Sequence, residues 1–310
     1  MKFRFLGTGT SVGVPQIGCG CPTCVSTDPR DKRRRCGAYV MAASGEALLI
    51  DTPPELRLAC LEYGISKVDA VALTHAHMDH VASFDDIRRF NTINGKTVPC
   101  DPNSPGANGR TMRVIGKPMP CYALPETISQ MHTIFPYISA KGGEMGLFRP
   151  QINFIDNTTP FTLGSLQIEA IRVEHGFPCC GYLLREEGAR AKGQGTRIKG
   201  EGPRDEGQGE TSQTSQTSQT SLAYISDCHV IGDEEIEKLH GVDVLALNCL
   251  RVREHPTHLS LEKSIEYIKR ISPKRAYLVH MCHDFTHTQW LDMLKDTNIE
   301  PAYDGLEIDL

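Results

Sequence analysis

The sequence has little of three features that mark large classes of protein. None of its hydrophobic runs approaches the ~18–20 apolar residues of a membrane span, so we expect no transmembrane helix. Basic residues are not in excess, because 33 Lys and Arg stand against 38 Asp and Glu, a formal net charge of −5. This balance argues against nucleic acid as the main partner. Met1–Leu6 lacks the apolar core of a signal peptide and alternates like a β-strand, which predicts a cytoplasmic protein.

The composition that remains is that of an ordinary globular chain, with 39% hydrophobic and 23% charged residues among 310. Its twelve cysteines come without an export signal. A reducing cytosol disfavours disulfides, so we expect these thiols to be metal ligands or buried apolar side chains.

The most informative stretch is Ala72–His80, which contains the pattern His-x-His-x-Asp-His. Val68–Thr74 is short, apolar and rich in β-branched residues, as expected of a buried strand. Val81–Phe90 has the apolar spacing of a helix. The histidines therefore lie on a loop at the C-terminal end of a strand, where open α/β sheets bind their ligands.

Three imidazoles and a carboxylate on this loop predict a site for divalent metal ions, because these groups are ligands of zinc and its neighbours. A single ion cannot easily take all four side chains from a hexapeptide. His75 and His77 alternate and can face one ion, whereas Asp79 and His80 lie further round the turn and suit a second. Paired cations of this kind assist hydrolytic reactions. The alternative is a histidine-rich surface loop without metal.

Two motifs carry a resemblance to a known family. The histidine loop after an apolar strand resembles the signature of the metallo-β-lactamase fold superfamily. Within it, the opening Leu6–Cys24, with its Gly-Thr-Gly-Thr and Cys-rich segments, resembles one branch. That branch contains the phosphodiesterase that opens phosphoribosyl 1,2-cyclic phosphate in the carbon–phosphorus lyase pathway. The resemblance extends to Tyr303–Ile308, and two long insertions are its main departures.

The resemblance implies an α/β fold, a four-layer αββα sandwich with its site at the sheet edges. It implies three more metal ligands, which are His175, Asp227 and His280. The ligands of the first ion would be His75, His77, His175 and Asp227, and those of the second Asp79, His80, Asp227 and His280. Asp227 would bridge the ions, zinc or manganese, with a water between them as nucleophile. Asp51 would brace the site from behind.

A second cluster, Cys19, Cys21 and Cys24, places three thiols in six residues. In a cytosolic protein this spacing predicts thiolate ligands of a structural zinc ion, which needs four donors. The candidates for the fourth donor are Cys36, Cys282 and His283. The resemblance implies His283. Burial of the three thiols as apolar side chains is the alternative.

His258 is the predicted general acid. The other site histidines are assigned as ligands, so nothing yet protonates a departing sugar oxygen. His258 lies where the resembling phosphodiesterase has an active-site histidine that is not a ligand. Imidazole titrates near neutral pH, which suits proton transfer. His255 is the competing candidate, and a solvent-facing loop histidine the remaining alternative. With Asp227, His258 completes the predicted catalytic residues.

One segment has a different composition from the rest of the chain. Glu186–Ser221 is rich in Gly, Gln and charge and nearly free of large apolar residues, so it cannot offset the entropy of ordering. We predict a disordered loop (residues 186–221) within a single domain of residues 1–310. It would join Tyr182–Leu184 to Ala223–Ile225 as neighbouring strands. Asn94–Arg113, rich in Gly, Pro and Asn, is a predicted surface loop and a candidate lid.

Together these features predict a binuclear metal-dependent hydrolase, a phosphodiesterase of a small cyclic phosphodiester. An RNA-processing nuclease should carry a basic arm, and the only basic run, Arg30–Arg35, is short. A thioester or lactam hydrolase would share the chemistry. A relative of the oxygenase in pyrroloquinoline quinone biosynthesis would share the Cys-rich opening but typically lacks the full histidine loop. The last alternative is a non-catalytic metal-binding protein. A homodimer is left open.

Overall fold

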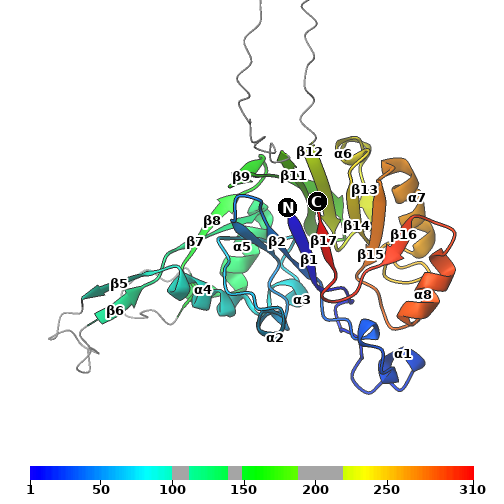
Figure 1. The fold of residues 1–310 in the computed structure, drawn as a ribbon, viewed down its shortest axis with the longest axis horizontal. Coiled ribbons are helices and arrows are strands. Elements are labelled where there is room, and N and C mark those ends of the chain that lie inside the picture. Colours follow the sequence, from blue (N-terminus) through cyan, green and yellow to red (C-terminus); the bar gives the residue numbers. More distant parts are fainter. Residues whose placement is uncertain (100–111, 139–148, 188–218) are drawn as a thin grey trace, which may run out of the picture.

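Two β-sheets face each other in this protein, and helices cover the outer face of each (Figure 1). The computed structural model describes residues 1–99, 112–138, 149–187 and 219–310. Apolar layers lie between the sheets and between each sheet and its helices. The predicted four-layer αββα sandwich is therefore confirmed. Within the described ranges no helix is both long and apolar enough to cross a bilayer.

The first sheet contains both chain ends, which lie next to each other in Figure 1. Its strands, in spatial order, are β17 (Glu307–Asp309), β1 (Lys2–Gly7), β2 (Gly37–Met41), β3 (Ala47–Ile50), β4 (Ala70–Ala72), β7 (Met119–Ala123) and β8 (Ile152–Asp156). β1, β2, β3 and β17 pair antiparallel, whereas β3, β4, β7 and β8 run parallel. As predicted, a short buried strand, β4, leads into the histidine loop.

The predicted loop Asn94–Arg113 is in part a ribbon. β5 (Lys96–Pro99) and β6 (Met112–Ile115) form an antiparallel pair outside the first sheet. Residues 100–111 of this loop lie outside the described residues. The candidate lid therefore stays a prediction.

The second sheet brings several candidate ligands to one edge. Its order is β13 (Val230–Ile231), β10 (Leu166–Glu174), β11 (Pro178–Glu187), β12 (Gln219–Ile225), β14 (Val244–Asn248), β15 (Arg275–Val279) and β16 (Ile299–Pro301), and β9 (Phe161–Leu163) pairs with β10. β12, β14, β15 and β16 are parallel. Parallel strands end at the same edge of a sheet, so Asp227 after β12 lies close to His280 after β15.

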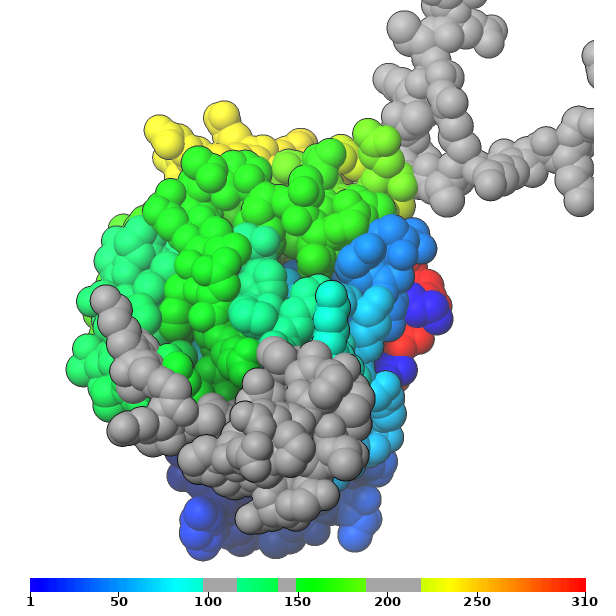
Figure 2. Space-filling view, turned by 90° about the vertical axis from the view of Figure 1, so that its left-hand side faces the viewer, coloured from blue at the N-terminus to red at the C-terminus, as the bar shows by residue number. Residues whose placement is uncertain are grey.

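Helices flank the two sheets in separate groups. Those packed on the first sheet are α2 (Leu56–Glu62), α3 (Met78–Val81), α4 (Ile87–Ile93) and α5 (Pro125–Ile134), with the 3₁₀ turns η2 (Phe84–Asp86) and η3 (Pro136–Ile138). Those on the second sheet are α6 (Asp233–Leu239), α7 (Leu261–Ile271) and α8 (His287–Leu294). α1 (Pro22–Val25) and η1 (Pro29–Asp31) belong to an N-terminal arm at the base of the molecule (Figures 1 and 2). Ser260 caps α7, because its hydroxyl accepts from the backbone nitrogen of Lys263.

Large side chains fill the layer between the sheets. Phe3 and Phe5 alternate along β1 and both point inward, where their rings lie 5.7 Å from that of Tyr224 and 6.0 Å from that of Tyr277, respectively. Trp290, on α8, is fully buried against the second sheet. Burial of this size stabilises the sandwich mainly through the hydrophobic effect. The strand ends are thereby held in fixed positions.

The predicted boundaries of the 186–221 loop are wrong at both ends. β11 and β12 are neighbouring antiparallel strands, as expected, but their pairing continues to Glu187 and Gln219. Glu186 is buried, and its carboxylate lies 2.6 Å from the amine of Met1. Ladder hydrogen bonds and this ion pair thus order residues whose composition alone is polar. Residues 188–218 lie outside the described residues, so their disorder and the single-domain assignment stay predictions.

Most charged side chains of the basic run Arg30–Arg35 form ion pairs with carboxylates. Its pairs are Arg30 with Asp28, Arg33 with Asp31, Arg34 with Glu62, and Arg35 with Glu55. Arg33 is buried and donates to the carbonyl oxygens of Cys282 at 2.7 Å and Phe285 at 3.1 Å. The run therefore ties the N-terminal arm to the second sheet and leaves little charge to attract a nucleic acid.

Candidate metal centre

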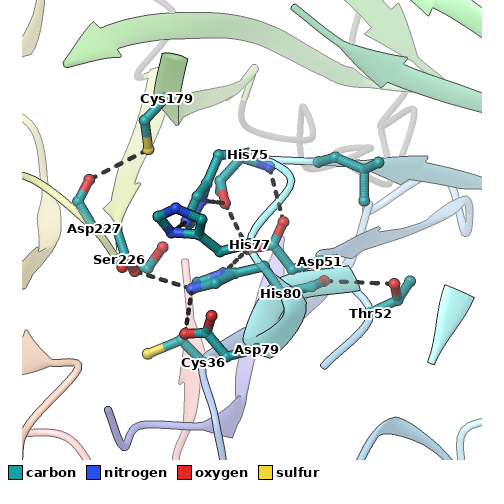
Figure 3. Close-up of polar contacts among 12 residues, drawn as sticks. Cys36, Asp51, Thr52, His75, His77, Asp79, His80, Cys179, Ser226 and Asp227 are labelled. Atoms are coloured by element: carbon teal, nitrogen blue, oxygen red, sulfur yellow. Dashed lines mark hydrogen bonds and ion pairs between the residues drawn. The ribbon is translucent and has the colours of Figure 1, made fainter. Parts of the chain in front are cut away.

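The residues predicted to bind catalytic metal meet at one edge of the sandwich. His75, His77, Asp79 and His80 follow β4, whereas His175, Asp227 and His280 follow β10, β12 and β15. Their donor atoms form two groups, and within each group they lie within 4.8 Å of one another. The first group is His75, His77 and His175, and the second is Asp79, His80, Asp227 and His280. We call these residues the His/Asp cluster. Figure 3 shows part of it.

The first group consists of three imidazoles. His75 Nε2 and His77 Nδ1 are 2.9 Å apart, and the ring of His175 lies 5.2 Å from each of the other two rings. His75 and His175 are buried and His77 is half-buried. These nitrogens therefore face one small volume.

Asp227 connects the two groups. Its Oδ1 lies 3.1 Å from His80 Nε2 and 3.0 Å from His280 Nδ1. Its Oδ2 lies 3.5 Å from His175 Nε2. Asp79 Oδ2 is 3.2 Å from His80 Nε2 and completes the second group. One carboxylate oxygen thus faces each group, which is the arrangement that a bridging ligand requires.

Hydrogen bonds behind the cluster fix its rings. Asp51 accepts from the backbone nitrogen and the hydroxyl of Thr74, both at 2.8 Å. It also accepts from His80 Nδ1 at 2.7 Å (Figure 3). The Thr74 hydroxyl oxygen in turn accepts from His75 Nδ1 at 3.0 Å. Asp51 has a φ of 63°, a costly conformation for a residue other than glycine. This network leaves Nε2 of both rings directed at the cluster, and Asp51 braces the site as the resemblance implies.

The donor atoms fit divalent cations. His80 Nε2, Asp227 Oδ1 and His280 Nδ1 are buried, yet none has a hydrogen-bond partner among the described residues. Buried polar atoms without a partner are costly. Donor spacings of 3.0 to 3.5 Å match those around a cation whose bonds are about 2.0–2.2 Å long. The set suits zinc or manganese.

The two groups differ in charge. Burial, aided by His80, lowers the pKa of His75 well below its ordinary range, and burial also lowers the pKa of His175. In the second group burial acts in the same direction, but Asp227 outweighs it and raises the pKa of His80, and that of His280 to about 10. Without cations, these shifts favour neutral rings at His75 and His175 and charged rings at His80 and His280, next to the carboxylates of the second group.

His258 lies at the edge of the cluster. Its ring is 4.6 Å from that of His175 and 4.7 Å from that of His280, and its Nδ1 is 3.9 Å from Asp227 Oδ2. The amide of Asn248 donates to this Nδ1 at 3.3 Å, which leaves the ring hydrogen on Nε2. The ring of His255 lies 5.1 Å from that of His258, further from the cluster.

The expected near-neutral pKa of His258 is wrong for the protein without substrate. Burial, followed by the charge of His280, lowers the pKa of His258 to about 3. The side chain sits among other histidines, which the sequence position alone did not reveal. An anionic substrate beside the ring would raise this pKa again. His258 is also close enough to His175 and Asp227 to act as a ligand instead.

The predicted structural site is assembled on the N-terminal arm. His283 Nδ1 lies 3.3 Å from the sulfurs of Cys19 and Cys21 and 3.5 Å from that of Cys24. The backbone amide of Cys24 lowers the pKa of Cys21 to about 6, which favours a thiolate. We call these four residues the zinc knuckle. Of the three candidates for the fourth donor, the structure brings His283 to the thiols, and Cys36 lies elsewhere.

Sequence reasoning missed two residues that support the site. Asn248 ends β14, donates to the carbonyl of Ser226 at 2.7 Å and accepts from the backbone nitrogen of Leu259 at 2.8 Å. It thereby holds the loop that carries His258. A polar residue at the end of the apolar strand Val244–Asn248 was the available signal. Cys36, buried beside His280, had none.

Comparisons with known proteins agree with this fold. The family model of the beta-lactamase superfamily domain matches residues 46–281. A crystal structure described as a new diphosphatase from the PhnP family is 29% identical, with a TM-score of 0.73 over 100% of this chain and 97% of that one. Zinc-bound PqqB from Methylobacterium extorquens, 15% identical with a TM-score of 0.67 and full coverage of both chains, shares the fold.

One curated relative is named for a different activity. The octanoyltransferase of Porphyromonas gingivalis is 29% identical over 310 residues, which are 99% of this chain and 51% of that protein. The chain thus spans about half the length of this relative.

Proposed function

Because the chain belongs to the beta-lactamase superfamily of metal-dependent hydrolases, we propose that it is a binuclear phosphodiesterase acting on a small, cyclic phosphodiester. The observation that carries this proposal is the position of Asp227. One of its oxygens faces His80 and His280 and the other faces His175. A site for two adjacent cations is suited to displacement at phosphorus.

Each residue of the site would have a distinct role in hydrolysis. When bound, zinc or manganese ions would lower the pKa of a water and offset the charge of the phosphoryl oxygens. Asp227 would hold the two positions at a fixed separation. Asp51 and Thr74 would keep the rings of His75 and His80 oriented. His258, held by Asn248, would lie beside the leaving group.

The charges of the chain and one similar protein bear on the size of the substrate. The basic run is paired with carboxylates, and the formal net charge is −5, so an extended RNA has little to bind. The similar PhnP-family protein is described as a diphosphatase. Both points favour a small phosphorylated molecule.

Hydrolysis of a diphosphate linkage is the second candidate, and the description of the similar PhnP-family protein as a diphosphatase favours it. A departing phosphate group leaves without needing a proton, whereas a sugar alkoxide needs one. In the protein without metal ions, burial and the charge of His280 lower the pKa of His258. The two substrate classes therefore make different demands on this residue.

Acyl transfer is not proposed for this chain. The name octanoyltransferase belongs to a protein of which this chain matches 51%. Covalent acyl transfer through a thiol needs an activated thiolate, whereas the thiol of Cys179 beside Asp227 is buried and burial raises its pKa well above its ordinary value. Direct hydrolysis of a thioester needs no such thiolate and is included in the test.

The test is a substrate panel with metal-analysed protein. It would contain bis(p-nitrophenyl) phosphate, a cyclic phosphoribose, a nucleoside diphosphate sugar, a thioester and a precursor tRNA, each assayed with wild type and with Asp227→Asn. We expect turnover of the cyclic diester and its loss in the variant. Turnover confined to the thioester or the tRNA, or fewer than two cluster ions per chain after reconstitution, would contradict the proposal. Cytoplasmic location and a homodimer stay predictions.

A further inference from the structure

His280 differs from three other ligand histidines of the His/Asp cluster in the group that lies behind its ring. His75, His80 and His175 each donate Nδ1–H to an oxygen, namely those of Thr74, Asp51 and the Thr257 carbonyl. Nε2 is then free to bind metal. In His280 the nitrogen that faces Asp227 is Nδ1. Its Nε2 is buried and makes no hydrogen bond to any described residue.

The buried side chain of Cys36 lies beside His280. Gly9 forms backbone bridges to both Arg35 and Met281, which brings the start of β2 beside the residue after His280. The Cys36 thiol donates to the carbonyl of Gly9 at 3.4 Å and also interacts with the imidazole of His280. Figure 3 includes Cys36 with the cluster.

A second polar group points to the same place. The Tyr224 hydroxyl is buried, has no hydrogen-bond partner within the described part of the chain, and interacts with the Cys36 sulfur. Cys36 is 1% exposed, and His280 and Tyr224 are 0% exposed, so water has no direct access to them. The Cys36 sulfur thus lies beside two buried side chains, His280 and Tyr224, each with a polar atom that has no hydrogen-bond partner among the described residues.

We propose that Cys36 is the positioning residue of His280, whose Nε2–H it accepts when Nδ1 binds the second cation. The inference rests on the two-ion site proposed above. Binding of a cation at Nδ1 leaves the ring hydrogen on Nε2, and sulfur is an adequate acceptor. Because the thiol hydrogen of Cys36 goes to Gly9, the sulfur lone pairs remain available. The Tyr224 hydroxyl would be a second donor to the same sulfur when the ions are bound.

A positioning role predicts a selective effect on one metal ion. Loss of groups behind metal ligands typically costs roughly 10- to 100-fold in metal affinity. We expect Cys36→Ala to weaken the second ion by this factor and to leave the first ion and the knuckle zinc unchanged. Cys36→Ser keeps an acceptor and should stay within a few-fold of wild type. Affinities of zinc and manganese would be measured by chelator competition, with stoichiometry from elemental analysis.

Cys121→Ala is the matched control, because Cys121 is equally buried in the first sheet but away from His280. It should lose stability without losing either ion. If Cys36→Ala unfolds, Cys36→Ser and Tyr224→Phe replace it, and the Tyr224→Phe change should weaken the second ion only. Cobalt-substituted protein gives a readout independent of activity, since the visible spectrum of the second ion should change alone.

The outcomes separate this inference from the proposed function. Wild type that binds fewer than two cluster ions would overturn the proposed function and the inference with it. Wild type with two ions, and Cys36→Ala with both at wild-type affinity, would overturn the inference alone. Equal weakening of both ions, or an equal effect of Cys121→Ala, would show that Cys36 acts only through packing and would also overturn it.

Discussion

The His/Asp cluster and the zinc knuckle are both expected to hold metal, but their surroundings differ. The ligands of the cluster follow buried strands, and Asp51 and Thr74 hold the rings by hydrogen bonds within the protein. The knuckle lies on a loop arm, where the four-residue α1 has no side-chain cap and Cys19 and Cys21 are only partly buried. Protein contacts can therefore form the cluster without ions, whereas we expect the knuckle to depend on its ion. Metal would then serve chemistry in one region and folding in the other.

Loss of the bridging carboxylate should have the largest effect. Asp227→Ala removes the oxygens that face both groups, so we expect loss of both cluster ions and of measurable turnover, with the knuckle zinc retained. His77→Ala should weaken mainly the ion of the first group. Elemental analysis after dialysis against graded chelator distinguishes them. Equal loss of a single ion in both variants would rule out a bridging role for Asp227.

His258→Ala should affect turnover but neither metal region. On a diester with an alkoxide leaving group we expect a fall in kcat of roughly 10²–10⁴-fold, the usual size of an acid–base contribution. On bis(p-nitrophenyl) phosphate, whose leaving group needs no proton, the fall should be much smaller. His255→Ala is the control. Equal losses on both esters would indicate that His258 binds phosphate, and loss of a cluster ion would indicate that it is a ligand.

Breaking the knuckle should reduce stability more than chemistry. Cys21→Ser or His283→Ala removes one of four donors, and metal-binding energy at such a site is folding energy. We expect the Tm to fall by about 5–10 °C, since each kcal/mol corresponds to about 2–4 °C in a chain of this size. The same variants should lose zinc. Chelator should remove the cluster ions from wild type before the knuckle zinc. Retention of knuckle zinc in His283→Ala would show that the fourth donor is another residue.

The base of the arm should carry a pH dependence. Asp304 accepts from the Thr8 hydroxyl at 2.8 Å and from the Arg34 backbone nitrogen at 2.7 Å. In the sequence, Thr8 precedes the knuckle thiols and Arg34 follows them. Burial raises its pKa from 3.8 to about 7, although Arg34 acts in the opposite direction. Between these values the folded protein binds a proton that the unfolded chain does not, so stability should fall as pH rises from 4 to 7.

The size of this slope is testable by substitution. A shift of this magnitude corresponds to at most about 4 kcal/mol. Asp304→Asn should flatten the pH dependence of denaturant unfolding between pH 4 and 7, whatever its effect on absolute stability. An unchanged slope would mean that the carboxyl stays ionised throughout.

Removing the residues between β11 and β12 should have the smallest effect on either region. Deletion of residues 188–218, with Glu187 joined to Gln219 through an Asn-Gly turn, leaves the paired ends of both strands intact. If the segment is disordered as its composition predicts, shortening it changes the entropy of loop closure by only about 0.6 kcal/mol per halving. We expect unchanged turnover, metal content and Tm. A large loss of activity in the folded variant would assign this segment a part in substrate or partner binding.

The sequence by itself determined the local parts of this protein. The histidine spacing predicted ligands on a strand-end loop, and the apolar strand before it, β4, is in place. The three thiols predicted a single site because they lie within six residues, and these thiols come together with His283. Such features depend on neighbouring residues, whose mutual positions the backbone restricts to a few arrangements. The resemblance to a family then supplied His175, Asp227 and His280, which no local pattern marks.

Only the tertiary structure decided how distant segments meet. The oxygens of Asp227 face different groups because β10, β12 and β15 end at one edge. The basic run became ion pairs because carboxylates from α2 and the arm lie against it. Burial among histidines lowers the pKa of His258 below the expected near-neutral range. Glu186 lies in a strand, where its carboxylate pairs with the amine of Met1. Charge, burial and pairing of this kind arise from contacts between residues far apart in the chain, so they exist only once the sheets have packed.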